Sequence, residues 1–328
     1  MKHTYEQEAY LAHVEPDLRI IEKLLEEELA TSLEVLNDVV RHIFFSGGKR
    51  LRPLLMVLCA RLCGTVTPEV FRGSVIFECL HMASLLHDDL IDEAKTRRGK
   101  PAAYTIWGNA GAVLSGDFLL ARTITIAAET NDMDVVKCLA SLTTEMAQGE
   151  LQQLVLKGHV DIPKEDYFHI IHRKTALLIE TACRVGAMLV HAPVEQIKAV
   201  DIYGYHLGMA FQIMDDILDY TADSTTLGKK TGTDLREGKA TLPILLVLEQ
   251  CTLAEKAYLE GLFGQKDVSP ADMDRVMELL SQYNALSQSL SYAKEHVAES
   301  VAALSIFSSS EMRDTLEAIS VFAIRRNV

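Results

Sequence analysis

Apolar residues recur every three to four positions along most of the chain, which is the period of an α-helix with a buried face. Glycine and proline interrupt this pattern at 46–48, 64–65, 98–101 and 227–232, where helices are expected to end. No alternating apolar and polar run indicates a β-strand of useful length. The pattern predicts helices, with ends uncertain by about 2–4 residues, at 5–30, 33–45, 51–63, 68–93, 102–130, 133–157, 164–191, 194–222, 234–250, 253–264, 270–283, 286–304 and 309–326.

No low-complexity tract and no long linker divides these segments. The prediction is therefore a single all-α domain over residues 1–328, a bundle of about 12–13 helices around a central cavity.

Composition narrows the classes of function that the chain can have. Apolar residues make up 48% of its 328 residues and aromatic residues only 6%, so the core must consist mainly of aliphatic side chains. The 46 acidic residues outnumber the 32 basic ones, giving a net charge of −14. Such a balance argues against general nucleic-acid binding, which needs a cationic face.

Residues 1–16 lack the apolar stretch of a signal peptide, and no run reaches the roughly 20 apolar residues that span a bilayer. We therefore expect a cytoplasmic protein with reduced cysteines in its core. Cys59 and Cys63 are one helical turn apart, but a zinc site would need further ligands that the neighbouring sequence does not offer.

Two short acidic motifs stand out, Asp88-Asp89-Leu90-Ile91-Asp92 and residues 215–219, which have the same DDxxD pattern. On a helix, residues four apart share one face, so the first and last aspartates of each motif point the same way. The neighbouring residues are apolar, and carboxylates beside a core are costly unless cations neutralise them. A solvated acidic helix face would explain one such motif, but two in apolar surroundings favour Mg²⁺.

Basic residues follow or precede each acidic motif. The segment 47–53 (GGKRLRP) places three cations after a glycine break, and Arg97-Arg98-Gly99-Lys100 directly follows the first motif. Lys229, Lys230 and Lys239 follow the second motif in the same way. Each segment alone would be an ordinary surface patch, but a metal with guanidinium and ammonium groups is the set that holds a diphosphate.

With these motifs in order, the chain resembles the trans-type polyprenyl diphosphate synthases over nearly its whole length, most of all the bacterial long-chain octaprenyl type. The matching segments are 47–53, 78–102 (ECLHMASLLHDDLIDEAKTRRGKPA), 115–117, 149–152, 174–176, 211–220 (FQIMDDILDY) and 227–243. Met82 and Ala240 depart from the residues common in the family, and neither is a charged ligand.

The resemblance implies an enzyme that condenses isopentenyl diphosphate with an allylic diphosphate, and it implies the following roles. The isopentenyl diphosphate ligands would be Lys49, Arg52, His81 and Arg98. The Mg²⁺ ligands would be Asp88, Asp92 and Asp215, with Asp89, Asp216 and Asp219 supporting them and three ions present once substrate is bound. The allylic diphosphate ligands would be Arg97, Lys174, Thr175, Gln212, Lys229 and Lys239, Lys174 also acting in catalysis. The family also implies a homodimer.

The helix before Asp88 bears on product length. Helical geometry places Ser84 one turn below Asp88, and the resemblance assigns Ala83 a similar role. Short-chain members carry bulky aromatic residues there, so two small residues favour a long tunnel beside a helix about 37 Å long and a product of about C35–C50. Octaprenyl diphosphate for a quinone side chain is the specific expectation, with Leu139 and Leu142 as the tunnel floor.

Three alternatives remain at this point. A farnesyl or geranylgeranyl diphosphate synthase would share the motifs but make a shorter product. A terpene cyclase would also use carboxylate-bound Mg²⁺, but with a different second motif and without the GGKRLRP segment. A non-catalytic synthase subunit would be expected to lack the aspartates, all six of which are present here.

Overall fold

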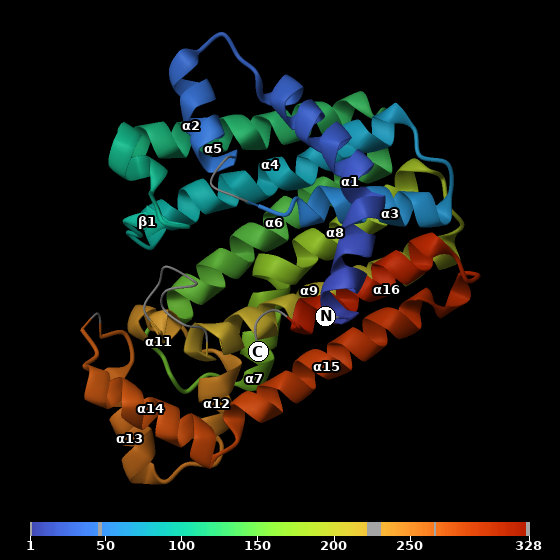
Figure 1. Cartoon of the computed structure of the whole chain (residues 1–328). Helices are drawn as coiled ribbons and strands as arrows, with labels where there is room; N and C mark the ends of the chain where they lie inside the picture. The colour runs from blue at the N-terminus through green and yellow to red at the C-terminus, as the bar shows by residue number, and fades with distance from the viewer. Residues whose placement is uncertain (1, 45–47, 222–230, 266, 326–328) are drawn as a thin grey trace. The chain divides into compact units, whose positions relative to one another are not determined.

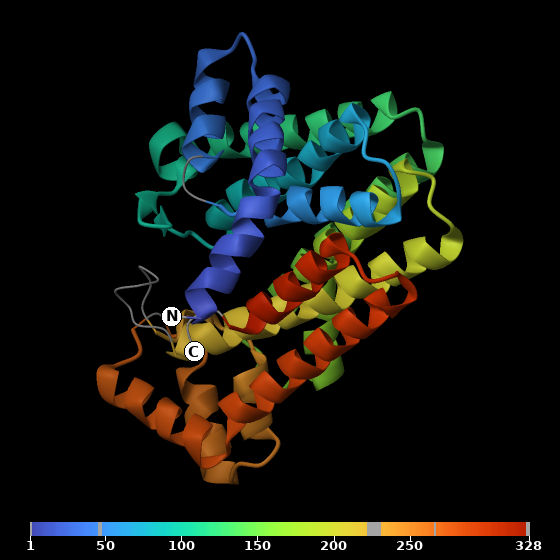
Figure 2. The same cartoon turned by 45° about the vertical axis from the view of Figure 1, so that its right-hand side comes forward.

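The computed structural model describes residues 2–44, 48–221, 231–265 and 267–325. Helices dominate it, as predicted, and they begin and end close to the expected positions (Figures 1 and 2). Contacts between residues group the chain into two compact units. Unit 1 comprises residues 1–141, 181–201 and 306–318, and unit 2 comprises residues 142–180, 202–305 and 319–328. The prediction of one domain remains a prediction.

Unit 1 is built around a pair of long helices that run side by side, α4 (Pro68–Ile91) and α5 (Ala103–Glu129). Helices α1 (Lys2–Leu29) and α3 (Leu51–Cys63) pack on α4, and α2 (Glu34–Phe44) packs on α5 (Figure 1). Helix α3 is apolar around most of its circumference, and Leu55 and Met56 are fully buried with Phe77 of α4. Pro68 begins α4 because its missing N–H is not needed in the first turn.

A two-stranded hairpin joins α4 to α5, pairing β1 (Thr96–Arg97) with β2 (Lys100–Pro101). Arg98 and Gly99 at its tip have φ angles of 51° and 76°, the geometry of a tight hairpin turn. Each strand has only two residues, too few to show the alternating pattern by which a strand is predicted from sequence.

Helix α5 is the one helix in the described part of the chain that is long and apolar enough to cross a membrane. It packs along α4 and α2 and buries Ala112, Leu119 and Ile126, whereas Leu114 and Ile124 are exposed.

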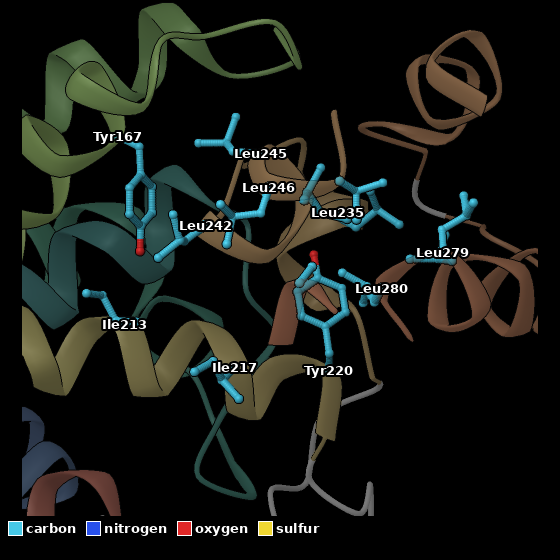
Figure 3. Close-up of a cluster of buried hydrophobic side chains, with 14 of the residues drawn as sticks. Tyr167, Ile213, Ile217, Tyr220, Leu235, Leu242, Leu245, Leu246, Leu279 and Leu280 are labelled. Atoms are coloured by element: carbon cyan, nitrogen blue, oxygen red, sulfur yellow. The ribbon is translucent and has the colours of Figure 1, made fainter. Parts of the chain in front are cut away.

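Unit 2 has its own apolar core (Figure 3). Its helices include α7 (Lys164–Ile171), α12 (Leu242–Leu248), α13 (Leu253–Leu262), α14 (Pro270–Gln282) and α15 (Ala285–Ala303). Helices α12, α14 and α15 pack on one another around Leu245, Leu246 and Leu280.

Four helices have residues in both units: α6 (Met133–Leu156), α8 (Leu177–Leu189), α9 (Val194–Thr221) and α16 (Glu311–Ile324).

Two helix predictions were wrong in detail. The helix expected at 234–250 is two helices, α11 (Thr233–Glu237) and α12, because Gly238 adopts φ 73° between them and lies against Gly158. The helix expected at 164–191 is interrupted by a π-helical turn, His172–Ala176, between α7 and α8.

The cysteines are free thiols in the structure. Cys59, Cys79 and Cys183 are buried, and Cys63, Cys138 and Cys251 are half-buried. Burial raises the pKa of Cys63 to about 12 and that of Cys79 above its usual range, which fits the expectation of unreactive core thiols.

Candidate active site

The middle aspartate of the first motif is buried and paired. Asp89, near the end of α4, is 3% exposed and accepts a hydrogen bond of 2.7 Å from Arg97 Nε on β1. Arg97 Nη2 lies 2.6 Å from the same carboxylate oxygen. Asp88 and Asp92 are half-buried instead, so the first and last aspartates of this motif are more accessible than the middle one.

The charges of four arginines of unit 1 act on His81. Burial lowers the pKa of His81 well below its usual range, and the charges of Arg52, Arg98, Arg97 and Arg50 lower it further. The imidazole is therefore neutral at physiological pH. A concentration of guanidinium groups around a neutral ring is suited to a highly charged anion.

Arg50 and Glu78 form a buried ion pair in this region. Arg50 Nη1 lies 2.7 Å from Glu78 Oε1, and the side chains are 7% and 5% exposed. Arg50 also donates to the Phe44 carbonyl at 2.7 Å and stacks on the Phe44 ring at 3.9 Å. Its backbone is left-handed, with φ 47°. The pair therefore fixes the segment that carries Lys49 and Arg52 to α4.

Sequence reasoning missed Arg50 and Glu78 as site residues. Glu78 is the only charged residue between Gly73 and His81, and a single carboxylate in a buried helix requires a cationic partner. The Arg50–Glu78 pair could have been predicted from this single carboxylate.

His87 connects the first motif to α5. Its Nε2 atom lies 3.2 Å from the Val113 carbonyl and 3.8 Å from Asp117 Oδ1. A Cβ atom on Gly116 would lie only 2.2 Å from this nitrogen. Gly116 is therefore required for the ring to pack here, one residue from Asp88.

The middle aspartate of the second motif is also buried and paired. Asp216 on α9 is 4% exposed and accepts hydrogen bonds from Gln212 Nε2 at 2.8 Å and from Tyr167 Oη at 2.7 Å. Thr175 Oγ1 in turn donates to Gln212 Oε1 at 2.8 Å. Burial, and then the charge of Asp234, raises the pKa of Asp216 well above its usual range.

Asp219 holds the start of α11. Its carboxylate oxygens accept hydrogen bonds from the backbone N–H groups of Thr233 and Asp234, at 3.2 and 3.1 Å. Carboxylates are stabilised at helix N-termini in this way. Asp219 thus supports the second motif by fixing the segment that follows it, and this segment brings Asp234 near Asp216.

The π-helical turn presents Lys174 and Thr175. Lys174 Nζ lies 2.9 Å from Glu150 Oε2 of α6. Two glycines of unit 2 allow the turn to pack closely. A Cβ on Gly149 would lie 2.7 Å from Arg173 Cβ, and a Cβ on Gly208 would lie 2.5 Å from Ala176 Cα. π-Helical turns often mark functional sites.

A cavity of about 120 Å³ lies in unit 2. Its lining includes Lys174, Thr175, Gln212 and Lys239, four of the predicted allylic diphosphate ligands, together with Tyr167, Asp216 and Asp234. Lys229 lies outside the described residues. Arg97 lies in unit 1, where it pairs with Asp89.

The polyprenyl synthetase family model matches residues 33–280. The chain belongs to this family. It is a polyprenyl diphosphate synthase, a prenyltransferase, of the long-chain trans type.

Individual relatives match nearly end to end. An octaprenyl diphosphate synthase of Haemophilus influenzae is 33% identical, with 95% of each chain covered. An all-trans-nonaprenyl diphosphate synthase of Rhodobacter capsulatus is 34% identical, covering 96% of this chain and 97% of its own. A crystal structure of a Caulobacter crescentus polyprenyl synthase complexed with calcium and isoprenyl diphosphate is 37% identical, has a TM-score of 0.92 and covers 97% of both chains.

The family depends on a divalent metal, and the carboxylates of the two aspartate motifs are oxygen ligands of the kind such a metal prefers. In the described part of the chain, no three His, Cys, Asp or Glu side chains converge closely enough to hold an ion by themselves. Mg²⁺ is usually bound by one or two carboxylates plus substrate phosphates and water. Asp88 and Asp92 in unit 1 and Asp215 in unit 2 are each half-buried, so each could supply such a carboxylate.

Three of the four predicted length-determining residues of the synthase are buried. Ala83 is 1% exposed, and Ser84 is half-buried with its hydroxyl donating to the His81 carbonyl at 2.9 Å. Leu139 and Leu142 are 4% and 2% exposed. Buried positions are suited to lining an apolar channel. Ala83 and Ser84 are in unit 1 and Leu142 is in unit 2, so the assignment of the tunnel floor remains a prediction.

Proposed function

We propose that this synthase condenses isopentenyl diphosphate repeatedly with an allylic starter, farnesyl diphosphate, to make octaprenyl diphosphate for a quinone side chain. The observation that carries the long product is the pair of small residues before Asp88, of which Ala83 is fully buried. A tail growing past this position meets a methyl group rather than an aromatic ring. The relative from Haemophilus influenzae, an octaprenyl diphosphate synthase, supports this length. We further propose that the synthase works in the cytoplasm and delivers its product to the membrane.

In unit 1, we assign the isopentenyl diphosphate to Lys49, Arg52, His81 and Arg98. The neutral His81 ring can donate one N–H to a diphosphate oxygen, and the guanidinium groups around it supply charge-assisted hydrogen bonds. Arg50 is committed to Glu78 and therefore holds this segment rather than the substrate.

The allylic diphosphate belongs with Lys174, Thr175, Gln212 and Lys239 of the unit 2 cavity, together with Arg97 and Lys229. About three Mg²⁺ ions, with Asp88, Asp92 and Asp215 as protein ligands, would neutralise the charge of the leaving pyrophosphate. Lys174 and Lys239 add positive charge where negative charge develops.

The reaction needs no nucleophilic side chain. The allylic C–O bond breaks, and its electron pair leaves with pyrophosphate. The double bond of isopentenyl diphosphate then attacks the allylic cation, forming the new C–C bond. One proton passes to the bound pyrophosphate, which restores a double bond and readies the lengthened chain for another cycle. The protein contributes orientation and exclusion of water.

We also propose a homodimer that pairs through α5. Six exposed positions follow one another at helical spacing along this helix: Ala110, Leu114, Asp117, Ala121, Ile124 and Ala128. Leu114 and Ile124 are 65% and 67% exposed, and only one of the six is charged. A stripe of small and apolar residues of this kind suits a second copy of the same helix.

The test is product analysis. Purified protein is incubated with isopentenyl and farnesyl diphosphates and Mg²⁺, and the dephosphorylated products are separated by chromatography. An octaprenyl alcohol is expected as the main product, and a main product of geranylgeraniol or shorter would contradict the proposal. Light scattering of the wild type and of Leu114→Glu tests the dimer, since the charged variant should be monomeric.

A further inference from the structure

Tyr167 reaches the second aspartate motif from another helix. It lies on α7 and is 2% exposed, and its hydroxyl donates to Asp216 Oδ2 at 2.7 Å. In Figure 3 its hydroxyl oxygen points towards the stretch of α9 that carries Ile213 and Ile217. Burial and the charge of Asp216 raise the pKa of Tyr167 well above its usual range, so the hydroxyl keeps its proton and remains a donor.

This hydrogen bond belongs to a network of three side-chain hydrogen bonds. Tyr167 donates to Asp216, Gln212 donates to the other oxygen of Asp216, and Thr175 donates to Gln212. Tyr167 and Thr175 lie at the two ends of one segment, 167–175, which includes Lys174. Both ends of this segment are therefore attached to α9.

This attachment has two geometric consequences. The carboxylate of Asp216 is directed towards α7, which leaves Asp215 about 100° round the α9 cylinder in a half-buried position. The same bonds hold the π-helical turn at a defined distance from α9, and with it Lys174 in the lining of the cavity.

We propose that Tyr167 is a positioning residue for diphosphate and metal binding, acting through Asp216 and the Gln212–Thr175 link. It touches no reacting atom. Its hydroxyl fixes how the aspartates of the second motif are oriented relative to Lys174. The carboxylates and the Lys174 ammonium group can then bind the same metal–diphosphate. This inference rests on the proposed function, because it assumes that the unit 2 cavity binds a metal–diphosphate.

The test uses Tyr167→Phe, which removes one oxygen and keeps the buried ring. The chain offers a matched control in Tyr258, which makes the same bond to Asp272 Oδ1, also at 2.7 Å and in unit 2, but outside the cavity. Tyr258→Phe therefore reports the general cost of losing a Tyr–Asp hydrogen bond.

Binding of Mn²⁺ with inorganic pyrophosphate is measured by calorimetry, and elongation is measured in parallel. Tyr167→Phe should weaken pyrophosphate binding and lower kcat/KM by about tenfold or more, the effect expected when a buried carboxyl group loses one of its hydrogen-bond donors. Tyr258→Phe should leave both unchanged. Equal behaviour of the two variants would overturn the inference.

A double-mutant cycle separates positioning from simple destabilisation. If Tyr167 acts through Asp216, adding Tyr167→Phe to Asp216→Asn should cost almost nothing further in pyrophosphate affinity. Fully additive losses would refute that mechanism. A wild type that neither elongates nor binds Mn²⁺ with pyrophosphate would instead overturn the proposed function, whereas an active wild type with an unaffected Tyr167→Phe overturns the inference alone.

Discussion

Arg97 Nε donates to Asp89 Oδ1 at 2.7 Å, which joins the hairpin after α4 to the motif at the end of that helix. This bond gives the middle aspartate of the first motif a structural task, and Asp216 has the corresponding task in the second motif. We expect the half-buried Asp88, Asp92 and Asp215 to be the metal ligands.

The pairing predicts different effects for neighbouring aspartates. Asp89→Asn should release the hairpin and reduce kcat/KM by about 10- to 100-fold while the Mg²⁺ concentration for half-maximal activity changes little. Asp88→Asn should raise that Mg²⁺ concentration strongly. Steady-state kinetics over a Mg²⁺ titration distinguishes them, and an equal shift in both variants would contradict the separate tasks.

The Arg50–Glu78 pair predicts a large loss of stability. Glu78→Gln leaves a buried guanidinium without its counter-charge and should lower the free energy of unfolding by about 3–5 kcal/mol. Urea denaturation measures it. The exposed pair Arg19–Glu15 is the control, since Glu15→Gln should cost less than about 1 kcal/mol.

The close contact of Gly208 with the π-helical turn leaves no space for a methyl group at position 208. Gly208→Ala should displace Ala176 and with it Lys174, lowering activity by about tenfold or more. Gly261 is the matched control in helix α13, because a Cβ there meets nothing within 4 Å. Gly261→Ala should keep full activity and should stabilise the helix by up to about 1 kcal/mol, as thermal unfolding would show.

The Ala83 position predicts control of product length. Ala83→Phe places a ring on the buried face of α4 and should shift the main product to a shorter chain, which chromatography of the dephosphorylated products detects. Unfolding by urea checks that the variant is folded, and unchanged chain lengths in a folded variant would contradict the role of this position.

His296 predicts a pH dependence of stability. Its Nδ1 atom lies 2.9 Å from Nδ1 of His206, and burial, then the charge of His206, lowers the pKa of His296 to about 4. Burial also lowers the pKa of His206, which the charge of Glu299 opposes. An unfolded histidine titrates near about 6.5, so the unfolded chain binds more protons between about pH 4 and about pH 6.5. Stability contributed by His296 is therefore complete above this window and falls as the pH drops through it.

Because His296 is half-buried, we expect this contribution to be on the order of 2 kcal/mol. Urea unfolding at a series of pH values measures it, and His296→Asn should flatten the curve in this window. A curve identical to that of the wild type would contradict the assignment.

The sequence allowed most helices to be predicted, because their apolar period is strong and Pro68 marks the start of α4. It did not reveal the π-helical turn, since all residues of 172–176 are compatible with an ordinary helix. The aspartate motifs and basic segments were visible as local patterns. The Tyr167–Asp216 bond was not, because it joins residues 49 positions apart and depends on how α7 packs near α9.

The π-helical turn also limits how this region can change in length. A π turn accommodates one more residue than the α-helical turn it replaces. Deleting one residue from 172–176 would restore regular α-helical hydrogen bonding but would rotate the residues on one side of the deletion by about 100° relative to those on the other side. Tyr167 and Thr175 could then no longer both reach α9. Insertions and deletions should therefore be absent from this segment in functional variants, even where substitutions are accepted.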